Sequence, residues 1–222
     1  MLKVVFAAAA VLLAQPARAQ FKTVTQPGEA PAYAAKDYPA VTQGVPFSYT
    51  AGALHVKLYQ GYVKNVNLLL QRFKELEAEG KTSSPEYAEL KRRFGWEFNG
   101  MRLHELFFAE LGASPLPDGS PLKAALAAQY GSFDAWKAGF LALVPTRGIG
   151  WAALVYDQAG GRFHNVWINE HDGGVPAGAQ VLLVLDLFEH AYLPDYQLDR
   201  ARYAQAFWGA VNWGEVARRF SK

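Results

Sequence analysis

An aspartate follows a run of apolar residues in the last quarter of the chain. Val181 to Leu185 is apolar throughout, Asp186 comes next, and His190 lies four residues later. A strand that buries its side chains gives an ionised carboxylate no water, so the charge requires a partner. A metal cation is the strongest partner available. The sequence therefore indicates a cation close to Asp186.

The segment around this aspartate resembles the signature of the iron/manganese superoxide dismutases. The matching residues, Leu185 to Tyr192, read LDLFEHAY. The resemblance implies that Asp186 and His190 are both ligands of an iron or manganese ion, and that the chain supplies two further histidines. Because the chain has no cysteine, a metal must be held by His, Asp and Glu side chains.

The second ligand segment of the family resembles Trp96 to Leu111, and this match makes His104 a ligand. By itself, a histidine at this place would be interpreted as a hydrogen-bonded residue between packed helices. Asp186 and His190 in the same chain reverse that preference, so His104 is predicted to bind the metal.

The first ligand segment resembles residues 55–63, in which His55 precedes the active-site tyrosine, Tyr62, by seven residues. In better-known members the tyrosine lies one residue further along, so an ungapped comparison places Leu54 at the ligand position. Seven residues are nearly two turns, which puts His55 and Tyr62 on one face of a regular α-helix. A longer spacing would need a π-bulge. We therefore predict a one-residue deletion that keeps His55 directed at the metal, with Leu54 as the competing position.

Further family features concern the pocket around the metal. His171 falls where many members have a glutamine that hydrogen-bonds the metal-bound solvent and others have histidine, and Gly100 occupies the alternative location of that glutamine. The resemblance thus implies that His171 contacts the solvent, that Tyr62 guards the substrate channel and that Trp151 helps to wall the pocket. The alternative for His171 is an exposed turn residue among Asp and Gly.

Five positions depart from the common pattern or concern a second subunit. Glu189 is implied to hydrogen-bond His190 of the partner subunit across a two-fold homodimer. Leu58 and Leu193 replace a histidine and a tyrosine that often meet across the same interface, which predicts a drier contact. Ala153 and Phe188 stand where tryptophan is usual, so the shape of the pocket is expected to differ while the ligand set is kept.

The hydrophobic periodicity predicts an α+β fold, in which an N-terminal antiparallel helical hairpin precedes a small three-stranded antiparallel sheet with flanking helices. Helices are expected over 51–80, 85–111, 122–130, 132–143 and 203–211, and strands over 150–156, 163–168 and 180–185. His164 is expected at an exposed strand position. The predicted organisation is a signal peptide (1–19), an extended lead-in (20–48), the hairpin domain (49–112) and a C-terminal α/β metal-binding domain (113–222).

The N-terminus has the pattern of a secretory signal. Met1 to Lys3 is basic, Val4 to Leu13 is an apolar run too short to span a bilayer, and Ala17 to Ala19 is a small-x-small cleavage site. The protein is therefore expected to be secreted or periplasmic; a retained N-terminal anchor is the alternative. The full chain has 22 basic and 20 acidic side chains. Removal of this segment takes away Lys3 and Arg18, so that the two numbers become equal. The remaining chain gives no electrostatic reason to expect nucleic acid or an anionic membrane as partner.

The function implied by the resemblance is superoxide dismutation, which converts superoxide to dioxygen and hydrogen peroxide by redox cycling of one iron or manganese ion per subunit. A non-catalytic metal-binding or adhesion protein on the same fold is the first alternative. A non-haem iron oxygenase that uses two histidines and one carboxylate is the second, and it would leave the third histidine unused.

Overall fold

The structure, a computed structural model, describes residues 31–220. The predicted signal peptide and the beginning of the lead-in lie outside these residues. The described part of the lead-in contains one short 3-10 helix, η1 (Pro39–Thr42), and is attached to the helices that follow. The side-chain amide of Asn67 pairs with both the backbone N–H and the C=O of Tyr33, and Lys36 forms an ion pair with Glu105 at 2.8 Å.

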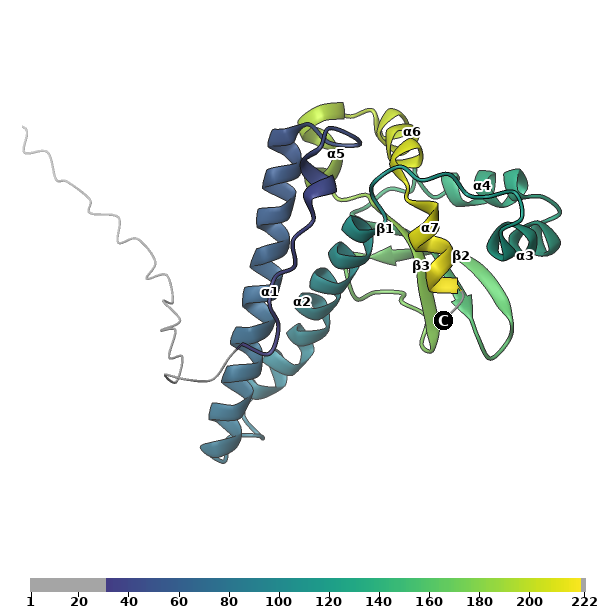
Figure 1. Ribbon diagram of the computed structural model, residues 1–222. Coiled ribbons are helices and arrows are strands. Elements are labelled where there is room, and N and C mark those ends of the chain that lie inside the picture. The colour runs from purple at the N-terminus through teal and green to yellow at the C-terminus, as the bar shows by residue number, and fades with distance from the viewer. Residues whose placement is uncertain (1–30, 221–222) are drawn as a thin grey trace, which may run out of the picture.

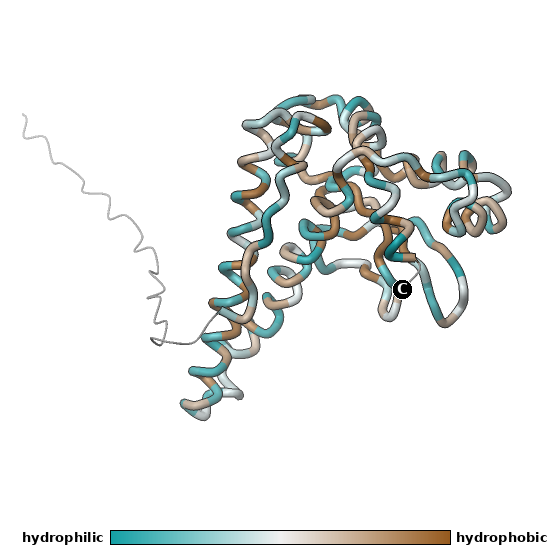
Figure 2. Tube along the Cα trace, in the orientation of Figure 1, coloured by the Kyte–Doolittle hydropathy of each residue, from teal (hydrophilic) through white to brown (hydrophobic). Residues whose placement is uncertain are grey.

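Two long helices form the predicted hairpin, α1 (Tyr49–Ala78) and α2 (Pro85–Ala109) (Figure 1). Each begins at a serine whose hydroxyl accepts a hydrogen bond from the first turn, Ser48 in α1 and Ser84 in α2. Figure 2 shows hydrophobic and hydrophilic residues alternating along α1, as expected of a helix that buries one face. Helix α1 is α-helical along its whole length, so it contains no π-bulge.

Three antiparallel strands follow, β1 (Gly150–Asp157), β2 (Arg162–Asn169) and β3 (Ala179–Asp186), in the order β2-β1-β3. Trp151 at the start of β1 pairs with Asp186 at the end of β3, and Gly150 pairs with Asn169 at the end of β2. One end of the sheet therefore collects the residue that follows the apolar run, the buried tryptophan and the turn that carries His171.

Five shorter helices complete the described chain: α3 (Pro121–Tyr130), α4 (Phe133–Leu141), α5 (Glu189–Tyr196), α6 (Arg200–Ala210) and α7 (Trp213–Phe220). The α+β prediction is confirmed, because a helical hairpin packs against a three-stranded antiparallel sheet with helices around it (Figure 1). His164 lies exposed on β2, as predicted. None of the helices in the described part of the chain combines the length and apolar character of a membrane span.

A buried ion pair joins the two parts of the fold. The Glu110 carboxylate at the end of α2 accepts from Arg219 of α7 at 2.6 Å and from the backbone N–H of Val184 in β3 at 3.0 Å. Arg219 also donates to the carbonyl groups of Leu106 and Leu182. This network keeps β3, and with it the aspartate at its end, against the helix that carries His104.

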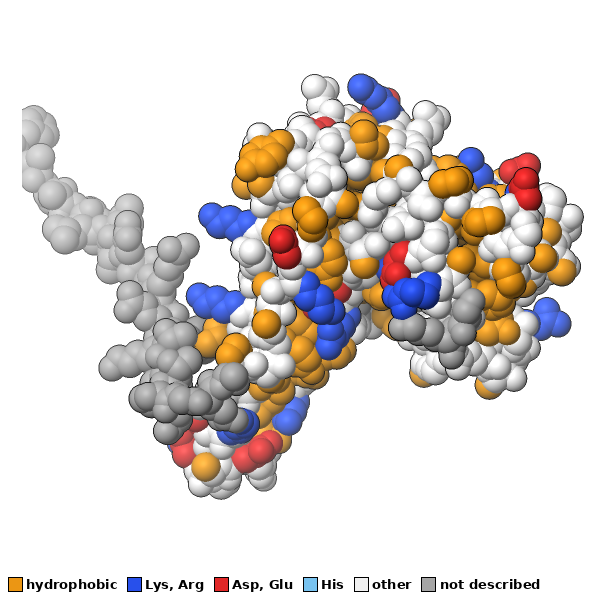
Figure 3. Space-filling model, in the orientation of Figure 1, with side chains coloured by type: hydrophobic (Ala, Val, Ile, Leu, Met, Phe, Trp, Pro, Cys, Tyr) orange, Lys and Arg blue, Asp and Glu red, His pale blue; other side chains and the backbone are white. Residues whose placement is uncertain are grey.

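The surface carries both signs of charge. On the face drawn in Figure 3, Lys and Arg side chains are interspersed with acidic and hydrophobic ones. Many of the charges on the hairpin are paired locally, such as Arg72 with Glu75 and Arg92 with Glu89. This face therefore offers no continuous basic surface of the kind that binds a nucleic acid backbone.

Candidate metal centre

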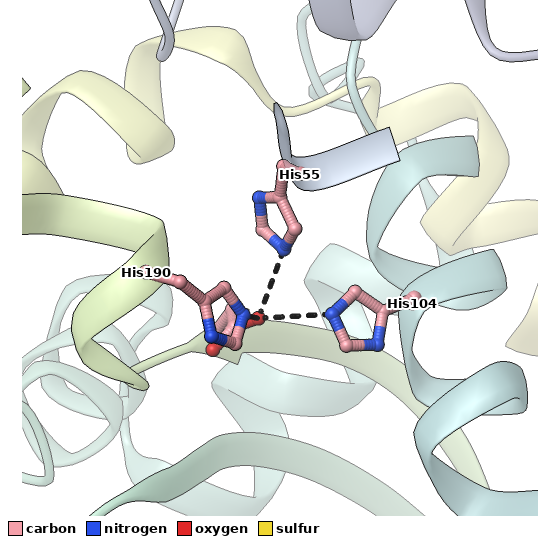
Figure 4. Close-up of side chains that lie close together, drawn as sticks. His55, His104 and His190 are labelled. Atoms are coloured by element: carbon pink, nitrogen blue, oxygen red, sulfur yellow. Dashed lines mark hydrogen bonds and ion pairs between the residues drawn. The ribbon is translucent and has the colours of Figure 1, made fainter. Parts of the chain in front are cut away.

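Four side chains from four elements converge at the end of the sheet. His55 comes from α1, His104 from α2, Asp186 from the end of β3 and His190 from the first turn of α5 (Figure 4). Their donor atoms all lie within 4.8 Å of one another. The structure thus brings together the four residues predicted from the sequence as ligands.

Asp186 Oδ2 lies at the middle of this cluster. The Nε2 atoms of His55 and His190 are each 3.2 Å from this oxygen, and Nε2 of His104 is 3.6 Å away. The other carboxylate oxygen, Oδ1, accepts from the backbone N–H of Phe188 at 2.9 Å. That hydrogen bond fixes the carboxylate, so that Oδ2 faces the three imidazoles.

The position of the first histidine follows from the regular geometry of α1. His55 is 2% exposed and faces the cluster, whereas Leu54 is 58% exposed. Tyr62 lies two turns further along the same face and is also buried. The structure therefore places His55, and not the competing Leu54, among the candidate ligands, with no π-bulge between His55 and Tyr62.

The protonation of His104 points to a cation. Its Nδ1 lies 2.6 Å from the carbonyl oxygen of Gly100 and donates to it. Burial lowers the pKa of His104 well below its ordinary value, so the ring is neutral and its Nε2 carries a lone pair. This nitrogen is buried without a hydrogen-bond partner and faces the Asp186 carboxylate. Two electron-rich atoms directed at each other in the interior fit a bound cation between them.

The remaining electrostatics agree with that requirement. Burial lowers the pKa of His55, although the hydrogen bond to Asp186 opposes the shift. Burial would raise the pKa of Asp186, but His190 and His55 hold it well below its ordinary value. Neutral imidazoles, as at His55 and His104, beside an ionised carboxylate are the protonation states that a divalent or trivalent metal ion needs.

Tyr62, His171 and Trp151 form a hydrogen-bonded row beside the cluster. The indole N–H of Trp151 donates to Nδ1 of His171 at 3.1 Å, and Nε2 of His171 lies 2.8 Å from the Tyr62 hydroxyl oxygen. Burial lowers the pKa of His171 to about 4, so the ring is neutral and, with Nδ1 accepting, its proton is on Nε2. His171 therefore donates to Tyr62, whose own hydroxyl hydrogen is left free to donate elsewhere.

This row bears on both sequence interpretations of His171, the contact with metal-bound solvent and the exposed turn. His171 is fully buried, which excludes the exposed-turn alternative. Both of its ring nitrogens already have protein partners, so the structure places Tyr62, rather than open space, next to the Nε2 proton. A direct contact between His171 and metal-bound solvent stays a prediction.

The sizes of Gly100 and Phe188 fit the space around Tyr62 and His171. A Cβ atom at Gly100 would lie 2.6 Å from Cδ1 of Tyr62, so only glycine lets the tyrosine ring pack against α2. Phe188 stacks on the His171 ring at 4.6 Å between centroids, with 18° between the planes. The phenyl ring thus covers the histidine imidazole at the place where the family usually has tryptophan.

Sequence reasoning missed two supporting residues. Phe47, at the end of the lead-in, packs edge-on against the His55 ring with 5.2 Å between centroids. The Arg200 guanidinium donates to the carbonyl oxygens of Thr146 and Leu187, both at 2.8 Å, and so ties the loop before β1 to the segment after Asp186. No helical or strand periodicity signals either role, because Phe47 precedes α1 and meets His55 only through the turn into that helix, and Arg200 reaches carbonyl groups 13 and 54 positions away in two loops.

Comparisons with known proteins agree with this geometry. The family model for the C-terminal domain of iron/manganese superoxide dismutases matches residues 117–219. A superoxide dismutase [Mn/Fe] of Propionibacterium freudenreichii subsp. shermanii is 33% identical over 172 residues, which cover 76% of this chain and 85% of the relative. A superoxide dismutase [Fe] of Methanothermobacter thermautotrophicus is 35% identical over 75% of this chain and 82% of its own length. The chain belongs to the iron/manganese superoxide dismutase family.

We expect the lowered pKa of His171 to make stability depend on pH. The unfolded chain takes up the His171 proton near the ordinary pKa of 6.5, whereas the folded protein takes it up only near 4, so stability is lost as the pH falls through this interval. In His171→Gln, the unfolding free energy of the metal-free protein should fall less steeply between these pH values, by about 1.4 kcal/mol per pH unit for the one proton removed. Urea denaturation in pH steps measures both slopes, and parallel slopes would contradict the expectation.

Proposed function

We propose that this chain is a superoxide dismutase, which converts superoxide to dioxygen and hydrogen peroxide at one iron or manganese ion per subunit. The proposed ligands are His55, His104, Asp186 and His190. The observation that carries the proposal is the buried, unpartnered Nε2 of His104 directed at the Asp186 carboxylate, with two further imidazoles at 3.2 Å from the same oxygen. Membership of the iron/manganese superoxide dismutase family supports it.

A bound iron or manganese ion would supply the one-electron redox chemistry that dismutation requires and that these side chains lack. The side chains of the chain would handle protons, which superoxide needs in order to leave as hydrogen peroxide. Burial and the nearby Asp186 charge raise the pKa of Tyr62, so its hydroxyl stays protonated at neutral pH. Because His171 donates to the Tyr62 oxygen, the tyrosine hydrogen can be directed at a reduced oxygen species. Trp151 holds His171 in the tautomer that does this.

The three converging histidines favour this function over the two alternatives. An oxygenase site of two histidines and one carboxylate would leave one histidine outside the cluster, but His55, His104 and His190 all face Asp186. A non-catalytic metal-binding protein does not need the Tyr62–His171–Trp151 row, which holds a proton donor beside the cluster. Activity measurements separate the catalytic and non-catalytic proposals directly.

A pair of neighbouring substitutions tests the ligand assignment. His55→Ala should lose the bound metal and slow the decay of superoxide more than about 100-fold. Even substitution of a residue that only hydrogen-bonds a metal ligand reduces metal affinity or activity by about 10- to 100-fold. Leu54→Ala, its exposed neighbour on the same helix, should keep both. Metal analysis by mass spectrometry, with one ion per subunit expected in the wild type, and stopped-flow decay of superoxide measure the outcome. A metal-loaded wild type without activity would overturn the proposed function, and metal retention in His55→Ala would overturn the ligand set alone.

We also propose that the protein is a homodimer joined beside the cluster. Glu189 is exposed, and its carboxylate makes no hydrogen bond or ion pair with any residue of 31–220, although it is the immediate neighbour of the partly exposed His190. Leu58 and Leu193 lie exposed on α1 and α5, which contact each other. In the proposed dimer, the Glu189 carboxylate accepts from His190 of the partner subunit and orients that ligand, while the leucines bury apolar surface.

Removing the proposed intersubunit acceptor should weaken the dimer. Glu189→Ala is expected to raise the dimer dissociation constant at least tenfold, about the effect of one hydrogen bond to a charged group, and to reduce metal retention. Glu89→Ala removes an exposed carboxylate near the start of α2, far in sequence from His104 at the other end of that helix; it is the matched control and should change neither. Sedimentation velocity over a concentration series provides the measurement. A wild type that stays monomeric at micromolar concentration, or a Glu189→Ala dimer as stable as the wild type, would contradict the proposed interface.

Export of the protein is a further proposal, supported by the basic, apolar and small-residue pattern of residues 1–19. Expression of the full chain in a bacterial host should give a mature product that begins at Gln20 and is found in the periplasm or the medium. Replacing the cleavage site by Ala17→Arg and Ala19→Arg should leave the segment attached. Intact-mass analysis of each cell fraction distinguishes cleavage from a retained membrane anchor, which would appear as the full-length mass in the membrane fraction.

A further inference from the structure

The turn that carries His171 is exposed on both sides of the buried imidazole. Glu170 and Asp172 face solvent while the His171 side chain is fully buried between them. The turn is closed by the backbone pair of Asn169 and Gly173, with N···O distances of 2.6 and 3.1 Å. Glu170 has a φ of 49°, a left-handed conformation that a glutamate adopts only when its surroundings hold it there. An exposed, strained turn does not by itself fix a buried ring.

Helix α2 holds this turn from one face. The indole N–H of Trp96 donates to the Glu170 carboxylate at 2.9 Å, and one turn later the Asn99 side-chain amide donates to the His171 carbonyl oxygen at 3.0 Å. Gly100 and His104 follow on the same side of the helix. One helix face therefore carries a candidate metal ligand, the space for Tyr62, and two hydrogen bonds to the turn.

The indole of Trp96 also covers the hydrogen bond between Tyr62 and His171. Its ring lies 4.5 Å edge-on from the His171 ring and 5.6 Å from the Tyr62 ring. The guanidinium of Arg93 lies over the indole at 3.8 Å and is itself held by Glu97. These contacts within α2 hold the indole independently of the turn, so the indole can restrict the movement of the turn.

We propose that Trp96 is a positioning residue, whose hydrogen bond to Glu170 holds the His171 turn so that the imidazole stays between Trp151 and Tyr62. The catalytic significance of this role rests on the proposed dismutase function, but the positioning itself does not. Without the Trp96–Glu170 hydrogen bond the strained turn can relax, and the His171–Tyr62 hydrogen bond opens more often. The orientation of the Tyr62 hydroxyl is then less well fixed.

The test uses two variants that remove the same hydrogen bond from opposite ends. Trp96→Phe keeps an aromatic ring but loses the N–H donor, and Glu170→Ala removes the acceptor at an exposed position where folding is not at risk. Glu170→Gln keeps an acceptor of the same length and serves as the rescue. Trp208→Phe, a half-buried tryptophan in the cluster with Trp136 and Trp213, is the matched control.

The main readout is the imidazole of His171 in metal-free full-length protein labelled with ¹⁵N-histidine. We expect a protonated Nε2 and an unprotonated Nδ1 in the wild type. Solvent exchange of the Nε2 proton should be about tenfold faster in Trp96→Phe and in Glu170→Ala, in keeping with the loss of one hydrogen bond. The double variant should exchange no faster than either single variant, because both remove one interaction. Glu170→Gln and Trp208→Phe should exchange at the wild-type rate.

The outcomes distinguish a failure of the positioning role from a failure of the proposed function. If the wild type proves to have no dismutase activity while the exchange pattern is as expected, the positioning role stands and the proposed function falls. Unchanged His171 exchange in both Trp96→Phe and Glu170→Ala would overturn the positioning role, whatever the activity. Additive effects in the double variant would also overturn it, since the two side chains would then act independently.

Discussion

The structure depends on one buried negative charge. The Asp186 carboxylate lies at the end of an apolar strand with no access to solvent, and three imidazoles from different helices face it. An isolated charge in this position would cost far more than a folded domain can offset, so the surroundings must supply compensation. The imidazoles supply part of it as polar neighbours, and the buried, unpartnered Nε2 of His104 fits a cation that supplies the rest. The helical hairpin and the sheet meet at this carboxylate.

The sheet and the helices divide the work of building the site. Antiparallel pairing of β1 with β3 brings Trp151 beside Asp186, and the end of β2 supplies the turn with His171. The hairpin contributes His55 and Tyr62 from α1. From α2 it contributes one face, which carries His104, the space at Gly100 for the Tyr62 ring, and two hydrogen bonds to the turn with His171. Because the hydrogen-bonded row crosses from the sheet to the hairpin, the row and the candidate metal ligands depend on the same interface between the two parts.

The residues around the Tyr62–His171 hydrogen bond are matched to one another in size. Gly100 gives up a side chain so that the Tyr62 ring fits against α2, and an imidazole at position 171 reaches the tyrosine from the sheet side. Phe188 covers that imidazole by stacking on it. These three positions fill one volume together, so a change at one of them is felt by the other two.

The sequence by itself determined the fold class, the candidate ligands His104, Asp186 and His190, and the pocket residues Tyr62, His171 and Trp151. Local patterns carry these features: helical and strand periodicity, a charge after an apolar run, and short family segments. Tertiary structure alone decided between Leu54 and His55, since the choice depends on which face of α1 meets the sheet. It also decided the tautomer of His171 and the roles of Phe47, Arg200 and Trp96. Those features arise from contacts between different elements of the fold, over separations from 13 to 109 positions for the hydrogen bonds and across the start of α1 for Phe47 and His55, and no local pattern encodes them.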